Sequence, residues 1–315
     1  MMIMTSRKIG NPFLPLLAIL IVLAICAPGL AASAKTSQKS FASPEDALKN
    51  LVVALKTNDE KNLLAILGPD ARDIISSGDP VADKAGREHF VKLYEEKQMI
   101  EGAETGKAVI SLGNEDYPFP IPVVKKGNAW RFDAKAGKEE LLNRRIGRNE
   151  LKVIEVLHAY ADAQREYAAK DRTGGGVGEF AQKIRSTPGK RDGLYWATKE
   201  GEEESPLGPL AAKAADEGYS KENTALYGYR YKILKAQGPH GEGGAFDYVV
   251  NGKMVLGFGL VAYPAQYGAS GIMTFIVNQN GIVYQKNLGK NTAKVAPKIM
   301  QYDPDTTWKK VELAE

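Results

Sequence analysis

The sequence has a single cysteine, Cys26, and only three histidines among its 315 residues. Cys26 lies in an N-terminal segment that we expect to be removed, so the mature chain would have no disulfide, zinc–thiolate site or thiol nucleophile. The histidines leave few candidates for a general base, and the Gly-x-Ser-x-Gly motif of serine hydrolases is absent. The sequence therefore contains no recognisable catalytic residue set, and we expect no metal or other cofactor.

The sequence also lacks a strong charge of one sign. Its formal net charge is +4, and two of the positive charges lie in the N-terminal segment. The basic pairs Lys125–Lys126, Arg144–Arg145 and Lys309–Lys310 are isolated along the chain. Nucleic-acid-binding domains present a continuous basic patch or stripe instead. We therefore expect no nucleic-acid partner.

The first 34 residues are typical of a secretory signal peptide. Arg7 and Lys8 precede an apolar run from Phe13 to about Ala27, and Ala32-Ser33-Ala34 supplies the small residues of a cleavage site. We expect cleavage after Ala34 and export to the periplasm or to the outside of the cell.

Two other fates of this segment stay open. A retained anchor is less favoured, because the apolar run is short for a span of about 20 residues and ends at Pro28-Gly29. Leu23-Ala24-Ile25-Cys26 is similar to a lipobox, but Ile25 is large where a small residue is expected. We therefore expect no stable membrane anchor after cleavage.

The chain is longer than a typical single domain, which favours two domains. After the signal peptide at 1–34, we predict an N-terminal domain at 41–147 and a C-terminal domain at 148–315. Both combine helices with antiparallel strands, which predicts the α+β class.

In the N-terminal domain, helices precede strands. Ser43-Pro44 combines an N-cap hydroxyl with proline at the first helical position, and a second helix should end at Gly68-Pro69. A third helix is predicted from Arg87 to Met99. Short apolar segments separated by turn residues then predict strands at 107–112, 120–124 and 129–132.

The C-terminal domain is predicted as one long helix followed by a meander of strands. Residues 149–169 place apolar side chains on one helical face, after a charged helical segment at 137–146 and a boundary at Gly147. A short helix is expected near 210–217. Alternating apolar residues and turn signals predict strands at 227–233, 246–250, 255–263, 272–277 and 282–285.

Tyr227, Tyr229 and Tyr231 alternate along the first of these strands and share one face. The favoured interpretation is a buried face that packs against the long helix. The alternative is a stacking platform for sugars or aromatic ligands.

Two patterns look like functional motifs but lack the context that their chemistry requires. Glu155 and His158 have the spacing of half a di-iron site, yet the sequence has no second Glu-x-x-His. The segment 176–181 matches a dinucleotide fingerprint, but it follows a helix rather than a strand. We interpret the first as the polar face of a helix and the second as a turn.

If the C-terminal domain carries a binding site, its loops are the better candidates, because loops commonly hold functional residues. His240 and Glu242 lie in the glycine-rich segment 238–244, and Tyr267 lies in the segment 264–271. His and Glu can act as ligand or acid/base groups. We predict His240, Glu242 and Tyr267 as ligand-binding residues and no catalytic residue; the alternative for 238–244 is a simple exposed hairpin loop.

The segments GRNELKVIEVLHAYADAQREYAAKD, RDGLYWA, ESPLGPL and YGYRYKILKAQGP, and the strands that follow them, resemble the exported bacterial proteins of the family named domain of unknown function 2950. The resemblance covers essentially the whole mature chain. It implies an exported protein and carries no reaction or site residue.

Two further likenesses concern the fold. SPEDALKNLVVALKTNDEKNLLAILG, with strands ending in GNAWRFD, resembles the nuclear-transport-factor-2-like fold, in which helices close over a curved sheet. The long helix, the Tyr-x-Tyr strand and MTFIVNQNGIVY are similar to the globular heads of type IV pilin-like and pseudopilin proteins. The helix begins at residue 149 and the prepilin cleavage pattern is absent, so we expect no pilin-type polymer.

These features favour an exported envelope or periplasmic protein without catalytic activity, acting as a binding or assembly-support module. Its partner would be an unknown envelope protein or a small ligand. The alternative is a hydrolase-type enzyme with its site in the cleft between the two predicted domains.

Overall fold

The computed structural model describes residues 38–172, 178–219 and 225–312. The predicted signal peptide with its cleavage site, and the triglycine segment 174–176, lie outside these residues. The chain divides into a unit of residues 1–35 and a unit of residues 36–315, and the description that follows concerns the second. Within the described part, no helix is long and apolar enough to span a membrane.

Helices α1 and α2 begin and end where the sequence indicates. α1 (Pro44–Lys56) starts after Ser43, whose hydroxyl accepts a hydrogen bond of 3.2 Å from the Asp46 amide. α2 (Glu60–Leu67) ends at Gly68, whose φ of 90° suits glycine and few other residues. The predicted start of α1 and the predicted end of α2 are both confirmed.

Helix α4 (Pro80–Glu96) begins a turn or more before the predicted start at Arg87. Asp79 caps it, because one carboxylate oxygen accepts hydrogen bonds from the amides of Val81 and Ala82 at 3.2 and 3.0 Å. Pro80 occupies the first helical position, as Pro44 does in α1. The two helices therefore share one type of start signal.

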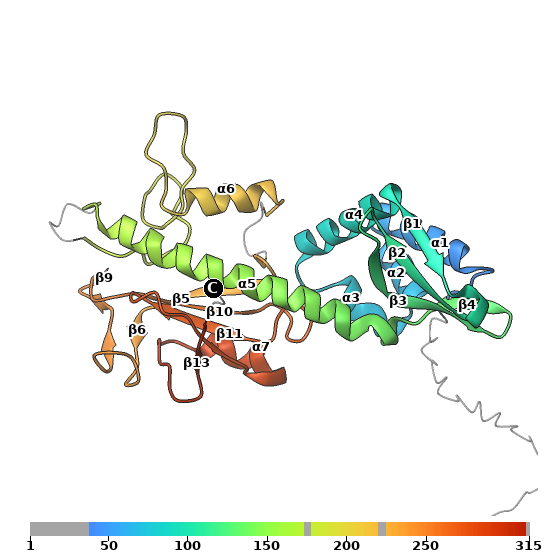
Figure 1. The fold of residues 1–315 in the computed structure, drawn as a ribbon. Coiled ribbons are helices and arrows are strands. Elements are labelled where there is room, and N and C mark those ends of the chain that lie inside the picture. The colour runs from blue at the N-terminus through green and yellow to red at the C-terminus, as the bar shows by residue number, and fades with distance from the viewer. Residues whose placement is uncertain (1–37, 173–177, 220–224, 313–315) are drawn as a thin grey trace, which may run out of the picture. The chain divides into compact units, whose positions relative to one another are not determined.

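A four-stranded antiparallel sheet follows these helices, with its strands in chain order (Figure 1). Three strands match the predictions, whereas β1 was expected to be the end of a helix. Helices and this sheet share one apolar cluster, which includes Leu48, Leu51, Ile66, Ile110 and Ile121. The elements between α2 and α5 are η1 (Pro69–Ala71), α3 (Arg72–Ile75), β1 (Gln98–Glu101), η2 (Ala103–Thr105), β2 (Lys107–Leu112), β3 (Tyr117–Lys126) and β4 (Ala129–Phe132).

A single helix of 35 residues, α5 (Ala134–Ala168), replaces the two helices that were predicted around Gly147. A Cβ at Gly147 would meet no atom within 4 Å, so this glycine is not required by packing. Good helix formers flank it on both sides, and they outweigh the modest helix penalty of one glycine. The prediction of a break was therefore wrong, while the domain boundary at 147 stays a prediction.

The two halves of α5 pack on two different sheets (Figure 1). Its first half lies against β3 at Gly137, where a Cβ would come within 2.4 Å of the Pro120 carbonyl oxygen. Its second half contributes Val153, Leu157 and Tyr160 to a separate apolar cluster with the C-terminal strands. α5 thus takes part in two separate hydrophobic cores.

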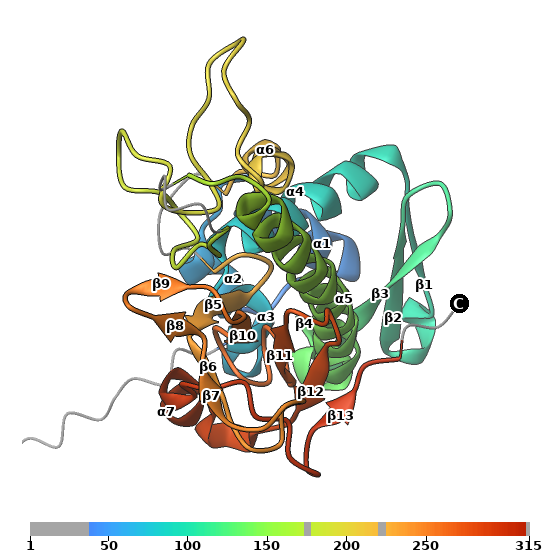
Figure 2. The same cartoon turned by 90° about the vertical axis from the view of Figure 1, so that its left-hand side faces the viewer.

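The C-terminal sheet has five antiparallel strands in the order β13-β12-β11-β10-β5. Two small hairpins, β6-β7 and β8-β9, extend the connection between β5 and β10. Figure 2 shows α6 on the side of α5 that faces away from this sheet, as does Figure 1. The elements are α6 (Gly208–Asp216), β5 (Tyr229–Leu234), β6 (Ala236–Gln237), β7 (Phe246–Asp247), β8 (Val249–Val250), β9 (Lys253–Met254), β10 (Gly259–Pro264), β11 (Thr274–Asn278), β12 (Tyr284–Lys286), η3 (Gly289–Asn291), α7 (Thr292–Val295), η4 (Ala296–Lys298) and β13 (Lys309–Lys310). Together with the first sheet and its helices, they confirm the α+β class.

The tyrosine stripe is divided between two environments. Tyr229 is fully buried in the C-terminal core, and its hydroxyl donates a hydrogen bond of 3.0 Å to the Met273 carbonyl. Tyr231 packs partly buried against the same cluster. Tyr227 lies before β5 with a φ of 53°, followed by Gly228 with a φ of 75°. The core interpretation holds for Tyr229 and Tyr231, whereas the strand begins two positions later than predicted.

Two carboxylates, of Asp79 before α4 and of Glu150 in α5, accept hydrogen bonds from the C-terminal part of the chain. The second oxygen of Asp79 accepts hydrogen bonds from the Tyr219 hydroxyl at 2.8 Å and from the Gly228 amide at 2.7 Å. Glu150 accepts from the amides of Ile272 and Met273 at 2.8 and 2.9 Å. Asp79 therefore serves both as the cap of α4 and as the anchor of the segment around Tyr227.

Candidate ligand-binding cavity

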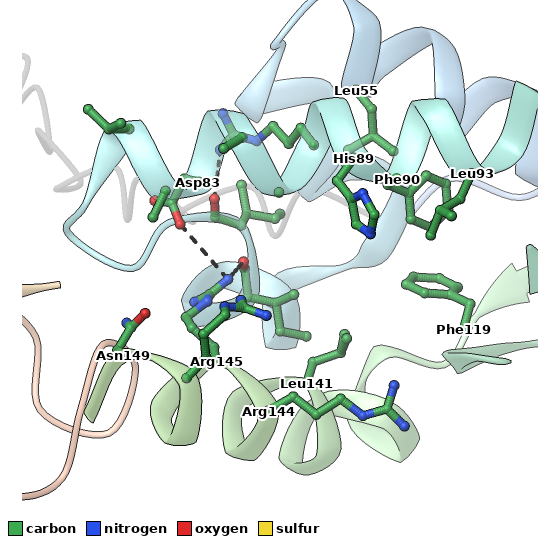
Figure 3. A pocket seen from close by; sticks show the side chains of 18 of the residues that line it. Leu55, Asp83, His89, Phe90, Leu93, Phe119, Leu141, Arg144, Arg145 and Asn149 are labelled. Carbon is green, nitrogen blue, oxygen red and sulfur yellow. Dashed lines mark hydrogen bonds and ion pairs between the residues drawn. The ribbon is translucent and has the colours of Figure 1, made fainter. Parts of the chain in front are cut away.

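A cavity of about 770 Å³ lies between α4 and α5, over the first sheet (Figure 3). This volume lies within the range of about 300–1,000 Å³ that is usual for small-molecule sites. Apolar side chains make up most of the wall. They come from α1, α2, the strands and both long helices: Leu51, Leu55, Leu63, Leu67, Leu93, Leu112, Ile121 and Leu141.

Aromatic and aliphatic residues gather at one end of the cavity (Figure 3). Phe90 and Leu93 lie on successive turns of α4, and Phe119 faces them from β3. The rings of Phe90 and Phe119 meet edge to face, with their centroids 5.0 Å apart. Leu141 of α5 completes this end, which we call the apolar end, although the side chains of His89 and Arg144 also lie on this side in Figure 3.

Charged and amide side chains gather at the other end, where Asp83, Arg145 and Asn149 lie together (Figure 3). The guanidinium of Arg145 lies 3.9 Å from the Asp83 carboxylate, and it donates a hydrogen bond of 2.7 Å to the Asp73 carbonyl and another to the Ile74 carbonyl. We call this the polar end. The cavity therefore has two chemically different ends.

Asp83 is the buried acid of the polar end. Its carboxylate accepts a hydrogen bond of 2.8 Å from the Ser77 amide. Burial raises the pKa of Asp83 above its usual range, although the Ser77 hydrogen bonds and the nearby Arg145 and Arg87 oppose the rise. The charged form of Asp83 thus depends on these partners.

Cations outnumber acids in the wall of the cavity. The cations are Arg87, Arg144, Arg145, Arg148 and Lys152, and the acids are Asp83 and Glu217. Burial lowers the pKa of Arg145; Asp83 opposes this shift, while repulsion from Arg148 and Arg87 adds to it. Arg144 lies on the side of Phe119 in Figure 3, but around Asp83 the cations Arg87 and Arg145 still outnumber the acid.

Tyr219 and Tyr227 form part of the wall together with Glu217. Their rings meet edge to face, with centroids 5.5 Å apart. The Tyr227 hydroxyl is buried and has no hydrogen-bond partner within the described residues. Burial, and next the Glu217 carboxylate, raise the pKa of Tyr227 to about 12. This hydroxyl is therefore neutral at physiological pH.

The three predicted ligand-binding residues lie outside the wall of this cavity. Nδ1 of His240 lies 2.9 Å from the Asp303 carboxylate, Glu242 accepts a hydrogen bond of 2.8 Å from Asn280, and the Tyr267 hydroxyl donates to Asn287 at 3.1 Å. Each residue thus bonds to a different partner. Their assignment as a binding site stays a prediction.

The loop that carries His240 and Glu242 is held by a buried side chain. The amide of Gln237 donates hydrogen bonds of 2.6 and 2.7 Å to the carbonyls of Glu242 and Gly244. Tyr248 in turn donates a hydrogen bond of 3.1 Å to the Gln237 side-chain oxygen. This buried amide fixes the course of the glycine-rich segment 238–244.

The half-motif of Glu155 and His158 forms no metal cluster. Glu155 makes an ion pair of 3.0 Å with Lys152 on the same helix. Within residues 38–172, 178–219 and 225–312, no group of three His, Cys, Asp or Glu side chains is arranged to hold a metal ion.

Sequence reasoning missed the polar end because it treated Arg144–Arg145 as an isolated basic pair. A signal was present in the helical spacing. Arg145, Arg148 and Lys152 are separated by three and four residues, so they share one face of a helix. Recognising α5 as one continuous helix would have aligned them.

Comparison with known proteins assigns the chain to a family, but it does not indicate a function. The model of one protein family, described as a protein of unknown function (DUF2950), matches residues 38–311. No curated protein matches the chain. No solved structure matches it either.

Proposed function

The chain belongs to the DUF2950 family of proteins of unknown function, and we propose that it is a non-catalytic binding protein that holds a small, largely apolar molecule in the cavity between α4 and α5. One observation carries this proposal: a cavity of about 770 Å³ has a mainly apolar wall. Transfer of apolar surface from water into such a wall is favourable by about 25 cal/mol for each Å².

The sequence supports a place for this protein in the cell envelope. Residues 1–34 have the features of a signal peptide, so we propose export to the periplasm or to the outside of the cell. An unknown envelope protein stays the proposed alternative partner, in an assembly-support role.

The finer fold assignments are also proposals. Helices α1, α2 and α4, packed with a four-stranded sheet, support the nuclear-transport-factor-2-like arrangement for the first part. For the second part, a long helix on an antiparallel sheet, the pilin-head-like arrangement stays a proposal.

A cavity-filling substitution tests the binding proposal. Leu141 lies in the wall of the cavity, so Leu141→Trp should weaken binding of the neutral apolar dye Nile red by about tenfold or more, because the indole would occupy ligand space. Saturable, blue-shifted dye fluorescence measures this affinity.

The matched control is Leu151→Trp on the same helix, at a side chain that is 60% exposed and outside the cavity wall. It should bind the dye like the wild-type protein. Circular dichroism must show that both variants are folded. If the wild-type protein shows no saturable dye binding, or if folded Leu141→Trp binds as well as the control, the proposal is wrong.

One observation favours a second candidate, a hydrolase with its site in this cavity. Burial raises the pKa of Asp83, as it does for general acids in apolar active sites. A hydrolase would turn over an ester substrate, and Asp83→Asn would abolish the turnover. A binding protein would release the same ester unchanged.

A further inference from the structure

We propose that the molecule held in the cavity is an anionic amphiphile, whose apolar body lies at the apolar end and whose single carboxylate or phosphate head is bound by Arg145 and Arg148 at the polar end. This inference rests on the proposed function, because it names the class of ligand for the same cavity.

The two ends of the cavity fit the two parts of such a molecule (Figure 3). On α4, Asp83 and Arg87 precede Phe90 and Leu93, so the polarity of the wall falls along the helix. On α5, Leu141 precedes Arg145 and Arg148. The ion pair of Asp83 with Arg145 shows that the polar segments of the two helices lie side by side. The cavity is therefore more apolar toward Phe90 and Leu93, where the one arginine, Arg144, is held by Glu140 and Tyr117.

Several of the cations already have strong partners. Arg87 forms an ion pair of 2.9 Å with Glu60 and donates a hydrogen bond of 2.6 Å to the Ile75 carbonyl. Arg144 pairs with Glu140 at 2.5 Å. These two side chains are held in place and need no anionic ligand.

Arg145 and Arg148 differ from them. The nearest carboxylate to Arg145 is Asp83 at 3.9 Å, beyond hydrogen-bond distance, and its two hydrogen bonds go to neutral carbonyls. Arg148 is exposed, and it makes no hydrogen bond or ion pair with any residue that the structure describes. One guanidinium is thus incompletely neutralised, and its neighbour on the same helical face has no partner among the described residues.

An oxyanion would complete this arrangement. Arginine presents a rigid fork of N–H donors that matches carboxylate and phosphate oxygens, and such charge-assisted hydrogen bonds are about twice as strong as neutral ones. The anion would also relieve the mutual repulsion of Arg145 and Arg148. A cationic head would add to that repulsion, and a neutral head would leave it unchanged.

Competition against Nile red tests the head group. The competitors share one alkyl chain and differ only in the head: dodecanoic acid, dodecyl phosphate, dodecanol and dodecylamine, each below its micelle-forming concentration. At slightly alkaline pH the carboxylic acid is ionised. We expect the acid or the phosphate to displace the dye at least about tenfold better than dodecanol, and the amine to be weakest. Whichever of dodecanoic acid and dodecyl phosphate displaces the dye at the lower concentration identifies the head group.

Arg148→Gln isolates the cation that has no partner among the described residues. With each competitor measured relative to the Nile red affinity of the same variant, it should reduce the preference for the anion over dodecanol by about five- to tenfold. Arg148→Lys should restore part of the preference. The matched control is Lys135→Gln, at an exposed residue of α5 outside the cavity wall, which should change neither value.

The possible results separate the two proposals. If Nile red fails to bind, the proposed function is wrong. If the dye and dodecanol bind but the anions bind no better than dodecanol, the proposal of an anionic head group is wrong and the proposed function stands. The same holds if Arg148→Gln leaves the preference for the anion over dodecanol intact.

Discussion

Asp79→Ala is expected to lower the free energy of unfolding by about 3–5 kcal/mol. Asp79 is fully buried, and its carboxylate accepts hydrogen bonds from Val81, Ala82, Tyr219 and Gly228. Alanine would leave these donors without their acceptor at a largely buried position. Urea unfolding followed by circular dichroism measures the loss.

Asp59→Ala is the matched control for this substitution. Asp59 also caps a helix, but it is exposed, and its side chain accepts one helix amide hydrogen bond, from Asn62 at 3.0 Å. Loss of such a cap costs about 1 kcal/mol. Equal losses in the two variants would show that Asp79 acts only as a cap and does not anchor the segment around Tyr227.

The second large effect concerns two glycines of α5 that should respond to alanine in opposite directions. Gly137→Ala places a Cβ 2.4 Å from the Pro120 carbonyl oxygen and 2.7 Å from the Ile121 amide nitrogen. Because these neighbours are backbone atoms, α5 must move away from β3. We expect a loss of about 1–3 kcal/mol or more in the free energy of unfolding.

Gly147→Ala is the internal control for this prediction. A Cβ there meets no atom within 4 Å, so the alanine should stabilise the helix by up to about 1 kcal/mol. Thermal unfolding of both variants measures the two changes. Similar shifts of one sign would contradict the close packing of α5 on β3 at Gly137.

Local signals in the sequence predicted the elements that local chemistry determines. Ser43-Pro44 marked the start of α1, and Gly68-Pro69 marked the end of α2. Asp79-Pro80 carries the same kind of signal for α4, before the predicted start at Arg87. The break expected at Gly147 shows the limit of this reasoning, because a single glycine cannot end a helix that is packed along both halves.

The cavity could not be predicted in the same way. Its wall comes from residues that lie far apart in the chain, from Leu51 on α1 to Tyr227 before β5. Only the fold brings these side chains together. The loops that carry His240, Glu242 and Tyr267 combine polar side chains with turn residues, a local property that does not report on concave shape.

The most direct measurement is a crystal structure of the protein with an alkanoic acid that carries bromine at the end of its chain. The anomalous signal of bromine locates the end of the chain independently of the head. We predict a bromine peak at the apolar end, near Phe90, Leu93 and Phe119, and a carboxylate within hydrogen-bond distance of Arg145 or Arg148. A bromine peak outside the cavity, or an empty cavity at saturating ligand, would contradict the proposal that this cavity binds an anionic amphiphile.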